Sequence, residues 1–312
     1  MRWAQRTAFL LLAAVMALGA ARLPTSPRRD TADGVYVYEG YAAATDAPWD
    51  EKSLELAAHR FQHLIETYFG GSGYRFCLSV VPDKAQFTRP PEGYVPADAS
   101  ETADWLAARL PVQAVDIASL LTLEDYYRTD PHWRQETLLP VAQRLAEALH
   151  VTLPEDREET LCALAGEFHG SYWGKTAETL AADTLAADTL SYLTDDVLEG
   201  CTVYDYETDS TGGAYDFAAA QTAPYDLFLG GSKSLLRIEN PAAENERTLI
   251  VFRDSFGSSL IPLLAEGYGT VYAVDIRYLA SDLLGRVMDI PVEADVLFLY
   301  SATVLHNSVT LK

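Results

Sequence analysis

The chain has 312 residues, of which 49% are hydrophobic, so it is long enough for one large α/β domain or two small ones with a core of ordinary size. Aspartate and glutamate number 45 against 23 lysines and arginines, which gives a formal net charge of −22. This composition excludes a wholly disordered chain, and so acidic a surface repels phosphate backbones, which argues against nucleic acid as a partner.

The N-terminus is typical of a targeting signal. Arg2 and Arg6 precede an apolar run from Ala8 to Ala21 that only one glycine interrupts and that ends in Gly-Ala-Ala. The run is shorter than the about 20 apolar residues of a spanning helix, and its end resembles a cleavage site. We therefore expect 1–33 to be a signal peptide or membrane anchor plus a linker, which predicts a secreted or membrane-anchored protein outside the cytoplasm. A buried N-terminal helix is the less favoured alternative, because the run has no polar face.

Helices and strands are predicted to alternate after the linker. Their expected ranges, in order, are a strand at 35–38, a helix at 50–69, a strand at 74–81, a helix at 100–110, a strand at 112–117 and a helix at 134–150. The last helix contains Pro140, which argues against its continuity. Cys77 lies in an apolar stretch and is predicted to be a buried free thiol, whereas Cys162 and Cys201 stay open as a disulfide pair. No CxxC pair is present, and we expect neither a metal nor a cofactor.

The motif from Tyr126 to Trp133 follows the third strand and reads Tyr-Tyr-Arg-Thr-Asp-Pro-His-Trp. In an extended segment Asp130 and His132 would face the same side, so that the carboxylate accepts from one ring nitrogen and the other points at a nucleophile. The alternative is a helix start, with Asp130 as N-cap and Pro131 at the first helical position. That alternative gives no reason for the histidine or the tryptophan.

The middle of the chain, from about 152 to 240, breaks the alternation and is expected to be an insertion. The pentapeptide Thr-Leu-Ala-Ala-Asp occurs at 179–183 and again at 184–188, which we interpret as a local expansion in a surface helix. The acidic, tyrosine-rich stretch 204–213 is predicted to be an exposed loop or hairpin, in preference to a sugar-stacking surface.

The alternation returns after about 240. Strands are predicted at 249–252, 270–276 and 296–300, and helices at 257–266 and 281–288. Together with 74–81 and 112–117 this makes five core strands. The pattern predicts one three-layer α/β/α domain over 34–312 with a central, mainly parallel five-stranded sheet.

Ser255 stands where the strand at 249–252 gives way to a helix. Open parallel sheets place reactive groups at this carboxyl edge, and the helix N-terminus supplies N–H donors for an oxyanion. Taken alone, the Asp-Ser-Phe-Gly segment is better explained by Asp254 or Ser255 as an N-cap. The presence of Asp130 and His132 changes that balance, because Asp, His and Ser together are the components of an acyl-transfer triad.

Five motifs in this order resemble the bacterial DHHW proteins, which are similar to the alginate O-acetylation proteins of the SGNH hydrolase-like superfamily. The motifs lie at 126–133, 227–231, 253–257, 274–278 and 296–300. The resemblance covers most of the chain from about Tyr36. It implies an SGNH hydrolase-like fold in which Ser255 is the nucleophile, His132 the general base and Asp130 the residue that orients it.

Two positions depart from the family pattern. Pro131 stands where the family name predicts a histidine, and Tyr300-Ser301-Ala302 stands at the end of the last predicted strand where an asparagine was expected, so the side-chain donor of the usual oxyanion hole is unidentified. We expect a backbone N–H of Gly230 or Gly231 to take its place. The other tentative substrate-binding residues are Phe256, Arg128, Tyr127 and Trp133.

The remaining histidines carry weaker signals. His59 and His63 are spaced i, i+4 but lack the glutamate of the metalloprotease motif, so a solvent-facing pair is favoured over a metal site. His150, His169 and His306 have no motif around them, although the aromatic segment 168–174 is a candidate wall near a site.

The function predicted from these features is an O-acetyltransferase or acetylesterase that acts, outside the cytoplasm, on a cell-surface or secreted polysaccharide. Its partners would be a glycan substrate and an unidentified acyl donor. The alternative is a non-catalytic glycan-binding or assembly protein that retains the fold. Metal-dependent hydrolysis through Asp130 and His132 is a third, weaker hypothesis.

Overall fold

The computed structural model describes residues 34–154, 159–175 and 185–312. The expected leader at 1–33 and the first copy of the repeated pentapeptide lie outside the described residues. Among the helices of the described segments, none combines the length and the apolar composition that a membrane crossing requires.

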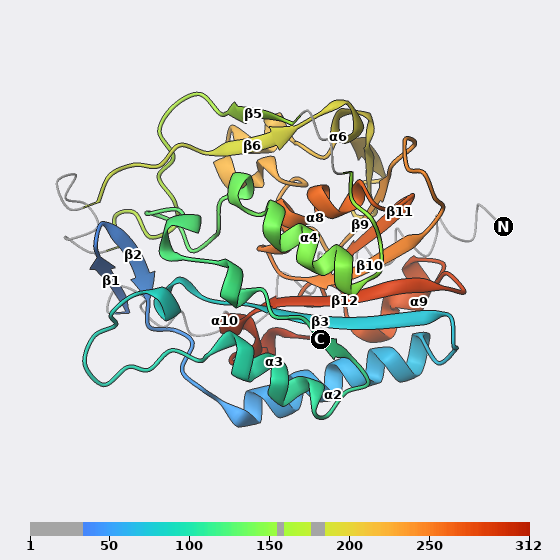
Figure 1. Cartoon of the computed structure of the whole chain (residues 1–312), viewed down its shortest axis with the longest axis horizontal. Helices are drawn as coiled ribbons and strands as arrows, with labels where there is room; N and C mark the ends of the chain where they lie inside the picture. The colour runs from blue at the N-terminus through green and yellow to red at the C-terminus, as the bar shows by residue number, and fades with distance from the viewer. Residues whose placement is uncertain (1–33, 155–158, 176–184) are drawn as a thin grey trace.

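An eight-stranded mixed sheet forms the centre of the molecule (Figure 1). Its first five strands are neighbours in parallel pairs, and the last three are antiparallel. In spatial order the strands are β4 (Gln113–Ala114), β3 (Tyr74–Val81), β12 (Ala294–Ser301), β10 (Thr248–Arg253), β11 (Thr270–Val274), β9 (Leu235–Glu239), β7 (Thr202–Asp205) and β8 (Ser210–Gly212).

The α/β class is confirmed, but the prediction of a five-stranded sheet is wrong. The five expected strands are the parallel ones, and β9, β7 and β8 add three more from the segment that was interpreted as an insertion. β9 is a short strand of five residues that pairs with β11, and β7 and β8 form an antiparallel hairpin within 202–212. The hairpin alternative for 204–213 is thus confirmed. Its pairing with β9 was not predicted, because long-range partners rather than local pattern decide whether such a segment joins a sheet.

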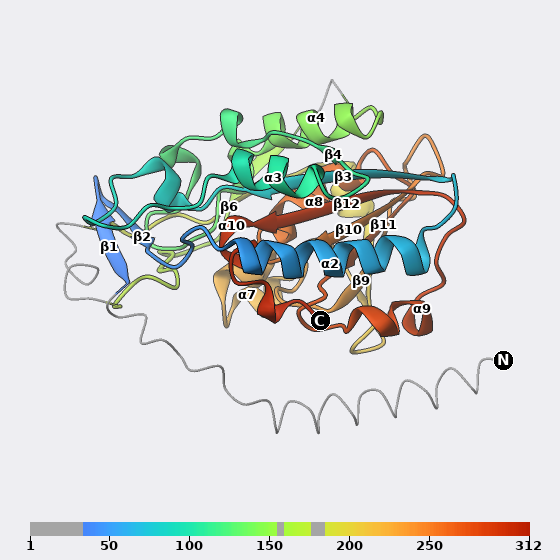
Figure 2. The same ribbon diagram turned by 90° about the horizontal axis from the view of Figure 1, so that it is seen from below.

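Helices cover both faces of the sheet. One face carries α2 (Glu51–Tyr68), α3 (Ala99–Ala107), α9 (Leu284–Val287) and α10 (Ala302–Leu305), and the other carries α4 (Leu139–Ala148), α6 (Asp196–Gly200) and α8 (Gly257–Ala265). Figure 2 looks onto α2, which runs along the sheet. In β10, Leu249 and Val251 enter one core and Ile250 and Phe252 the other, which explains why this strand is apolar throughout.

Smaller elements surround this core. They are the hairpin β1 (Val35–Tyr38) with β2 (Tyr41–Ala44), the pair β5 (Thr160–Ala163) with β6 (Ser191–Thr194), and the short helix α7 (Phe217–Ala220). In both views the β1–β2 hairpin lies at the end of the sheet where β12 leads into α10, the carboxyl edge of the parallel strands (Figures 1 and 2).

Three local predictions need correction. The helix expected at 134–150 begins only at Leu139, because Pro140 is accommodated in the first turn and not in a helix interior. The described part of the second pentapeptide copy is not helical: Leu185 is buried and Asp188 forms an isolated β-bridge with Phe168. The strand expected at 112–117 is reduced to the two residues of β4.

All three cysteines lie in the described segments, and none is in a disulfide. Cys77 is buried, as expected, and burial raises its pKa to about 11, so the thiol is inert at neutral pH. Cys201 is likewise buried, and Cys162 is partly exposed.

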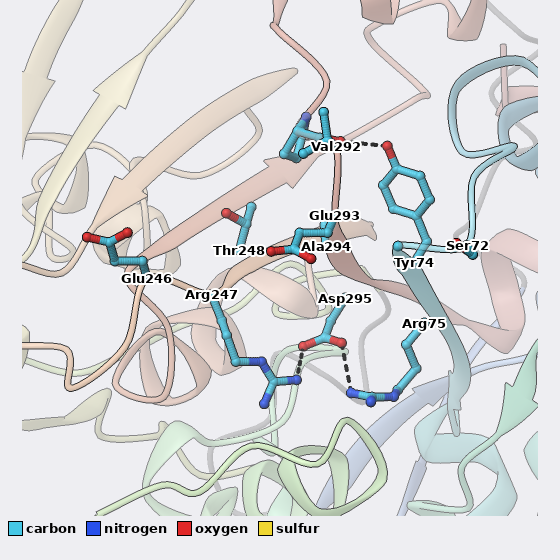
Figure 3. A pocket seen from close by; sticks show the side chains of 12 residues that line it. Ser72, Tyr74, Arg75, Glu246, Arg247, Thr248, Val292, Glu293, Ala294 and Asp295 are labelled. Carbon is cyan, nitrogen blue, oxygen red and sulfur yellow. Dashed lines mark hydrogen bonds and ion pairs between the residues drawn. The ribbon is translucent and has the colours of Figure 1, made fainter.

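A cavity of about 820 Å³ lies at the amino edge of the parallel strands, opposite Ser255 (Figure 3). Inside it, Arg75 and Arg247 bracket Asp295 at 3.0 and 2.5 Å. Both guanidinium groups also donate to the carbonyl of Leu149 at the end of α4, at 2.6 and 2.8 Å. The two arginines therefore cap a helix C-terminus and share one carboxylate, which is a structural role.

We expect Asp295→Ala to lower the free energy of unfolding by about 2 kcal/mol. The variant would leave two cations without their shared carboxylate, and their partial exposure, 41% and 34% of the side chains, limits the loss. Urea unfolding measures it, with the exposed Asp289→Ala as control. A stability equal to wild type would contradict the role given to this network.

Candidate active site

Ser255 lies in the turn between β10 and α8, at the carboxyl edge of the sheet. Neither Asp254 nor Ser255 caps α8, because Phe256 holds the N-cap position and the helix has no side-chain cap. The carboxylate of Asp254 instead accepts from the N–H of Phe256 at 3.0 Å and from the N–H of Ser301 at 2.7 Å. Asp254 thereby ties the turn to the end of β12. The hydroxyl of Ser255 is left for another partner.

That partner is His132. Its Nε2 lies 2.7 Å from the Oγ of Ser255, although 123 residues separate the two in sequence. Its Nδ1 lies 2.5 Å from the Oδ1 of Asp130. Because an ionised carboxylate only accepts hydrogen bonds, Nδ1 carries the proton and Nε2 accepts from the serine hydroxyl. The structure thus brings the three residues predicted from sequence into one hydrogen-bonded chain.

The local conformation of the motif differs from the extended segment that we expected. Tyr126 and Trp133 form an isolated antiparallel bridge, and the residues between them bend into a tight loop. Within it the carboxylate of Asp130 also accepts from the backbone N–H of His132 at 3.2 Å, which closes a turn around Pro131. The helix-start alternative is excluded, because the next α-helix begins at Leu139.

The environment of Asp130 favours the carboxylate. Burial by itself raises the pKa, but the adjacent His132 and the N–H groups of His132 and Ser171 outweigh it and lower the pKa of Asp130 to about 2. The N–H of Ser171 donates to Oδ2 at 2.8 Å. Gly170 allows this approach, because a Cβ there would lie 2.2 Å from the Cβ of Asp130. The aromatic segment 168–174 therefore reaches the site through its backbone.

Aromatic rings hold the imidazole in place. Tyr225 stacks on His132 with centroids 3.9 Å apart and an interplanar angle of 14°, and its hydroxyl lies 3.0 Å from the Oγ of Ser259. Phe256 also packs against the imidazole of His132, with the ring centroids 4.8 Å apart. Sequence reasoning missed Tyr225, since one tyrosine among 18 carries no local signal.

Two of the tentative substrate-binding residues lie in the core and are not exposed to a substrate. Trp133 and Tyr127 are fully buried, and the indole N–H of Trp133 donates to the carbonyl of Phe256 and to Ser259, at 3.1 and 2.9 Å. Both rings therefore support the site from inside the core. Phe256 is also nearly buried, and Arg128 is the member of this group that is exposed.

The glycine pair contributes unequally to a candidate oxyanion hole. The N–H of Gly231 donates to the carbonyl of Phe228 at 3.1 Å and is thus occupied. Among the described residues, the N–H groups of Gly230 and Ser255 have no acceptor, which leaves them as candidate donors. Ser301, which stands where an asparagine was sought, uses its hydroxyl to accept the N–H of Val304 at 3.4 Å.

Two of the other histidines make contacts within the scaffold. His63 lies 2.7 Å from Asp282, and His306 accepts the N–H of Asp50 at 2.9 Å while its Nε2 contacts Thr102 at 2.9 Å. In 34–154, 159–175 and 185–312, no group of three or more His, Cys, Asp or Glu side chains is arranged to hold a metal ion.

The lowered pKa of Asp130 predicts acid sensitivity. Because this pKa is lower in the folded than in the unfolded protein, the carboxylate stabilises the fold fully above about pH 4 and loses that effect as the pH falls through about 2. Between about pH 5 and pH 2, wild type should lose up to about 2 kcal/mol more unfolding free energy than Asp130→Asn. Urea titrations at each pH test this, with the exposed Asp104→Asn as control. Equal acid sensitivity of wild type and Asp130→Asn would contradict the charge assignment.

Comparison with known proteins supports the family resemblance that the motifs indicate. Residues 124–274 match the family model of the DHHW protein. No curated protein matches the chain significantly. Three solved structures share the fold: a DHHW family protein from Eubacterium siraeum, PatB1 from Bacillus cereus with a sulfonyl adduct, and the O-acetyltransferase domain of Pseudomonas putida AlgJ.

Their TM-scores are 0.69, 0.61 and 0.55, at 22%, 18% and 14% sequence identity. The matches cover 88%, 87% and 88% of this chain and 92%, 94% and 92% of the three relatives. At these identities the likeness shows the fold alone. The resemblance found in the motifs is thus confirmed for residues 124–274, which match the DHHW family model.

Proposed function

We propose that this protein is a serine-dependent acyl ester enzyme, an O-acetyltransferase or acetylesterase, in which Ser255 is the nucleophile. The observation that carries the proposal is the unbroken chain from Asp130 through His132 to Ser255, with contacts of 2.5 and 2.7 Å. A nucleophile, a base and an oriented carboxylate in this geometry are the components of acyl transfer.

The reaction follows from this geometry. The Oγ of Ser255 attacks the carbonyl carbon of the acyl donor while Nε2 of His132 takes its proton, and the anionic Asp130 stabilises the resulting imidazolium. The N–H groups of Ser255 and Gly230 would bind the oxyanion. His132 then gives its proton to the leaving group, which leaves an acyl ester on Ser255.

In the second half of the reaction an acceptor hydroxyl attacks that ester. Nε2 of His132 takes the proton of the acceptor and returns it to Ser255 as the acyl group departs. If the acceptor is water the outcome is hydrolysis, and if it is a sugar hydroxyl the outcome is transfer. Both outcomes use the same three side chains.

The fold neighbours support an acyl-group chemistry. One is named an O-acetyltransferase domain, and another carries a sulfonyl adduct, the product of sulfonylating a nucleophile. From the motif resemblance to alginate O-acetylation proteins we propose a cell-surface or secreted polysaccharide as acceptor, and from the leader predicted at 1–33 a location outside the cytoplasm. We further propose an SGNH hydrolase-like domain over 34–312, with an insertion at about 152–240 and a leader or anchor at 1–33.

A non-catalytic glycan-binding role is the second candidate. The observation that favours it is the hydroxyl of Ser301 turned to capping where the family pattern has an oxyanion donor. Glycan binding that survives Ser255→Ala, in a protein without esterase activity, would favour this role.

We expect a sulfonyl fluoride or fluorophosphonate probe to label wild type at one serine and to leave Ser255→Ala unlabelled. The exposed Ser119→Ala is the matched control and should react like wild type. His132→Ala should lower both labelling and hydrolysis of a small acetyl ester by about a thousandfold, because the hydroxyl would lose its base. Equal labelling of wild type and Ser255→Ala would remove Ser255 as the nucleophile.

A further inference from the structure

The loop between Tyr126 and Trp133 carries Asp130. Its backbone lies between two charged side chains that the proposed reaction does not use. Lys84, just beyond the end of β3, is 3% exposed. Asp188, from the second pentapeptide copy, is partly buried. One is bonded to the carbonyl groups of the loop and the other to its N–H groups.

Lys84 binds three carbonyl oxygens. Its Nζ donates to Ala42 in β2 at 2.7 Å, to Tyr127 at 2.5 Å and to Asp130 at 2.7 Å. An ammonium has three N–H donors, so every donor has one acceptor, whereas a neutral amine would have only two. The three contacts join β2 to residues 127 and 130 of the loop.

The ammonium has no carboxylate within 4 Å among the described residues. Burying such a charge costs several kcal/mol unless hydrogen bonds compensate it. A leucine or methionine would fill the same space without that cost. The three carbonyl contacts therefore explain why position 84 is a lysine. Two of them fix the backbone of the loop.

Asp188 binds the same loop by accepting hydrogen bonds from the N–H groups of the loop. Its carboxylate accepts from the N–H of Arg128 at 2.9 Å, from the N–H of Thr129 at 2.9 Å and from the hydroxyl of Thr129 at 2.8 Å. Its own backbone is fixed by reciprocal hydrogen bonds with Phe168, at 2.8 and 3.0 Å. Thr129 in turn accepts the N–H of Gly170, which precedes the residue that binds the carboxylate of Asp130.

We infer that Lys84 and Asp188 are positioning residues for the triad: together they align the peptide groups of 127–130 so that the carboxylate of Asp130 meets the ring of His132. The inference rests on the proposed function. Neither side chain touches a reacting atom. A displacement of about 1 Å in such a support costs about a hundredfold in rate, which is the scale of effect that the pair controls.

The charge of Lys84 gives the inference a pH signature. Burial lowers the pKa of Lys84 to about 7, against the opposing attraction of Asp130 and Asp188. The other group that faces the ammonium is the ring of Tyr172, 5.4 Å away. Loss of the proton as the pH rises through about 7 would leave one carbonyl without a donor, so the reactivity of Ser255 should fall above that pH.

The test compares the rate of sulfonyl fluoride labelling in wild type, Lys84→Met and Asp188→Asn, with the exposed Lys52→Met as matched control. Thermal unfolding of each variant establishes that it is folded. We expect Lys84→Met to react at least about tenfold more slowly and to lose the alkaline decline, Asp188→Asn to react about tenfold more slowly, and Lys52→Met to match wild type. If Lys84→Met does not fold, Asp188→Asn carries the comparison.

A second readout separates this inference from the proposed function. The proton between Nδ1 of His132 and Asp130 should give a strongly deshielded NMR resonance in wild type, which weakens or disappears in both variants. If wild type labels and the folded variants label equally fast, the inference is overturned. If wild type does not label, the proposed function fails, and the resonance alone decides: its persistence in both variants overturns the inference.

Discussion

The buried carboxylate of Asp130 is the group on which the rest of the site depends. A carboxylate removed from water is stable only when hydrogen bonds or a nearby cation replace its hydration. Here the ring and N–H of His132 and the N–H of Ser171 provide that replacement, and the carboxylate stays ionised with a pKa of about 2. An ionised Asp130 fixes the tautomer of His132, which in turn leaves Nε2 free to accept from Ser255.

The sheet supplies the second requirement, a rigid meeting place. β3, β10 and β12 run parallel, so Lys84, Ser255 and Ser301 all lie at or just beyond strand ends at one edge. Asp254 links two of these ends through the N–H of Ser301. Loops from distant parts of the chain can then be held on this edge to within hydrogen-bonding distance, which acyl transfer demands of its catalytic groups.

Much of this arrangement could be predicted from the sequence, for identifiable reasons. The parallel strands were visible because residues buried on both faces give continuous apolar runs, and Asp130, His132 and Ser255 were visible because capping and packing left the histidine unexplained. β9 and the addition of the β7–β8 hairpin to the sheet were missed because they depend on pairing with β11 and with each other. Tyr225, Gly170 and Lys84 were missed because each acts through a contact over at least 40 residues, which local pattern does not encode.

The central claim is that Ser255 carries the acyl group during turnover. It is tested most directly by mixing the protein with an excess of an activated acetyl ester, quenching in acid during turnover and locating the acetyl group by peptide mass spectrometry. The account predicts an acetyl ester on Ser255 that decays when a hydroxyl acceptor is added. Turnover that continues with Ser255 unmodified, or with the acetyl group on another residue, would contradict it.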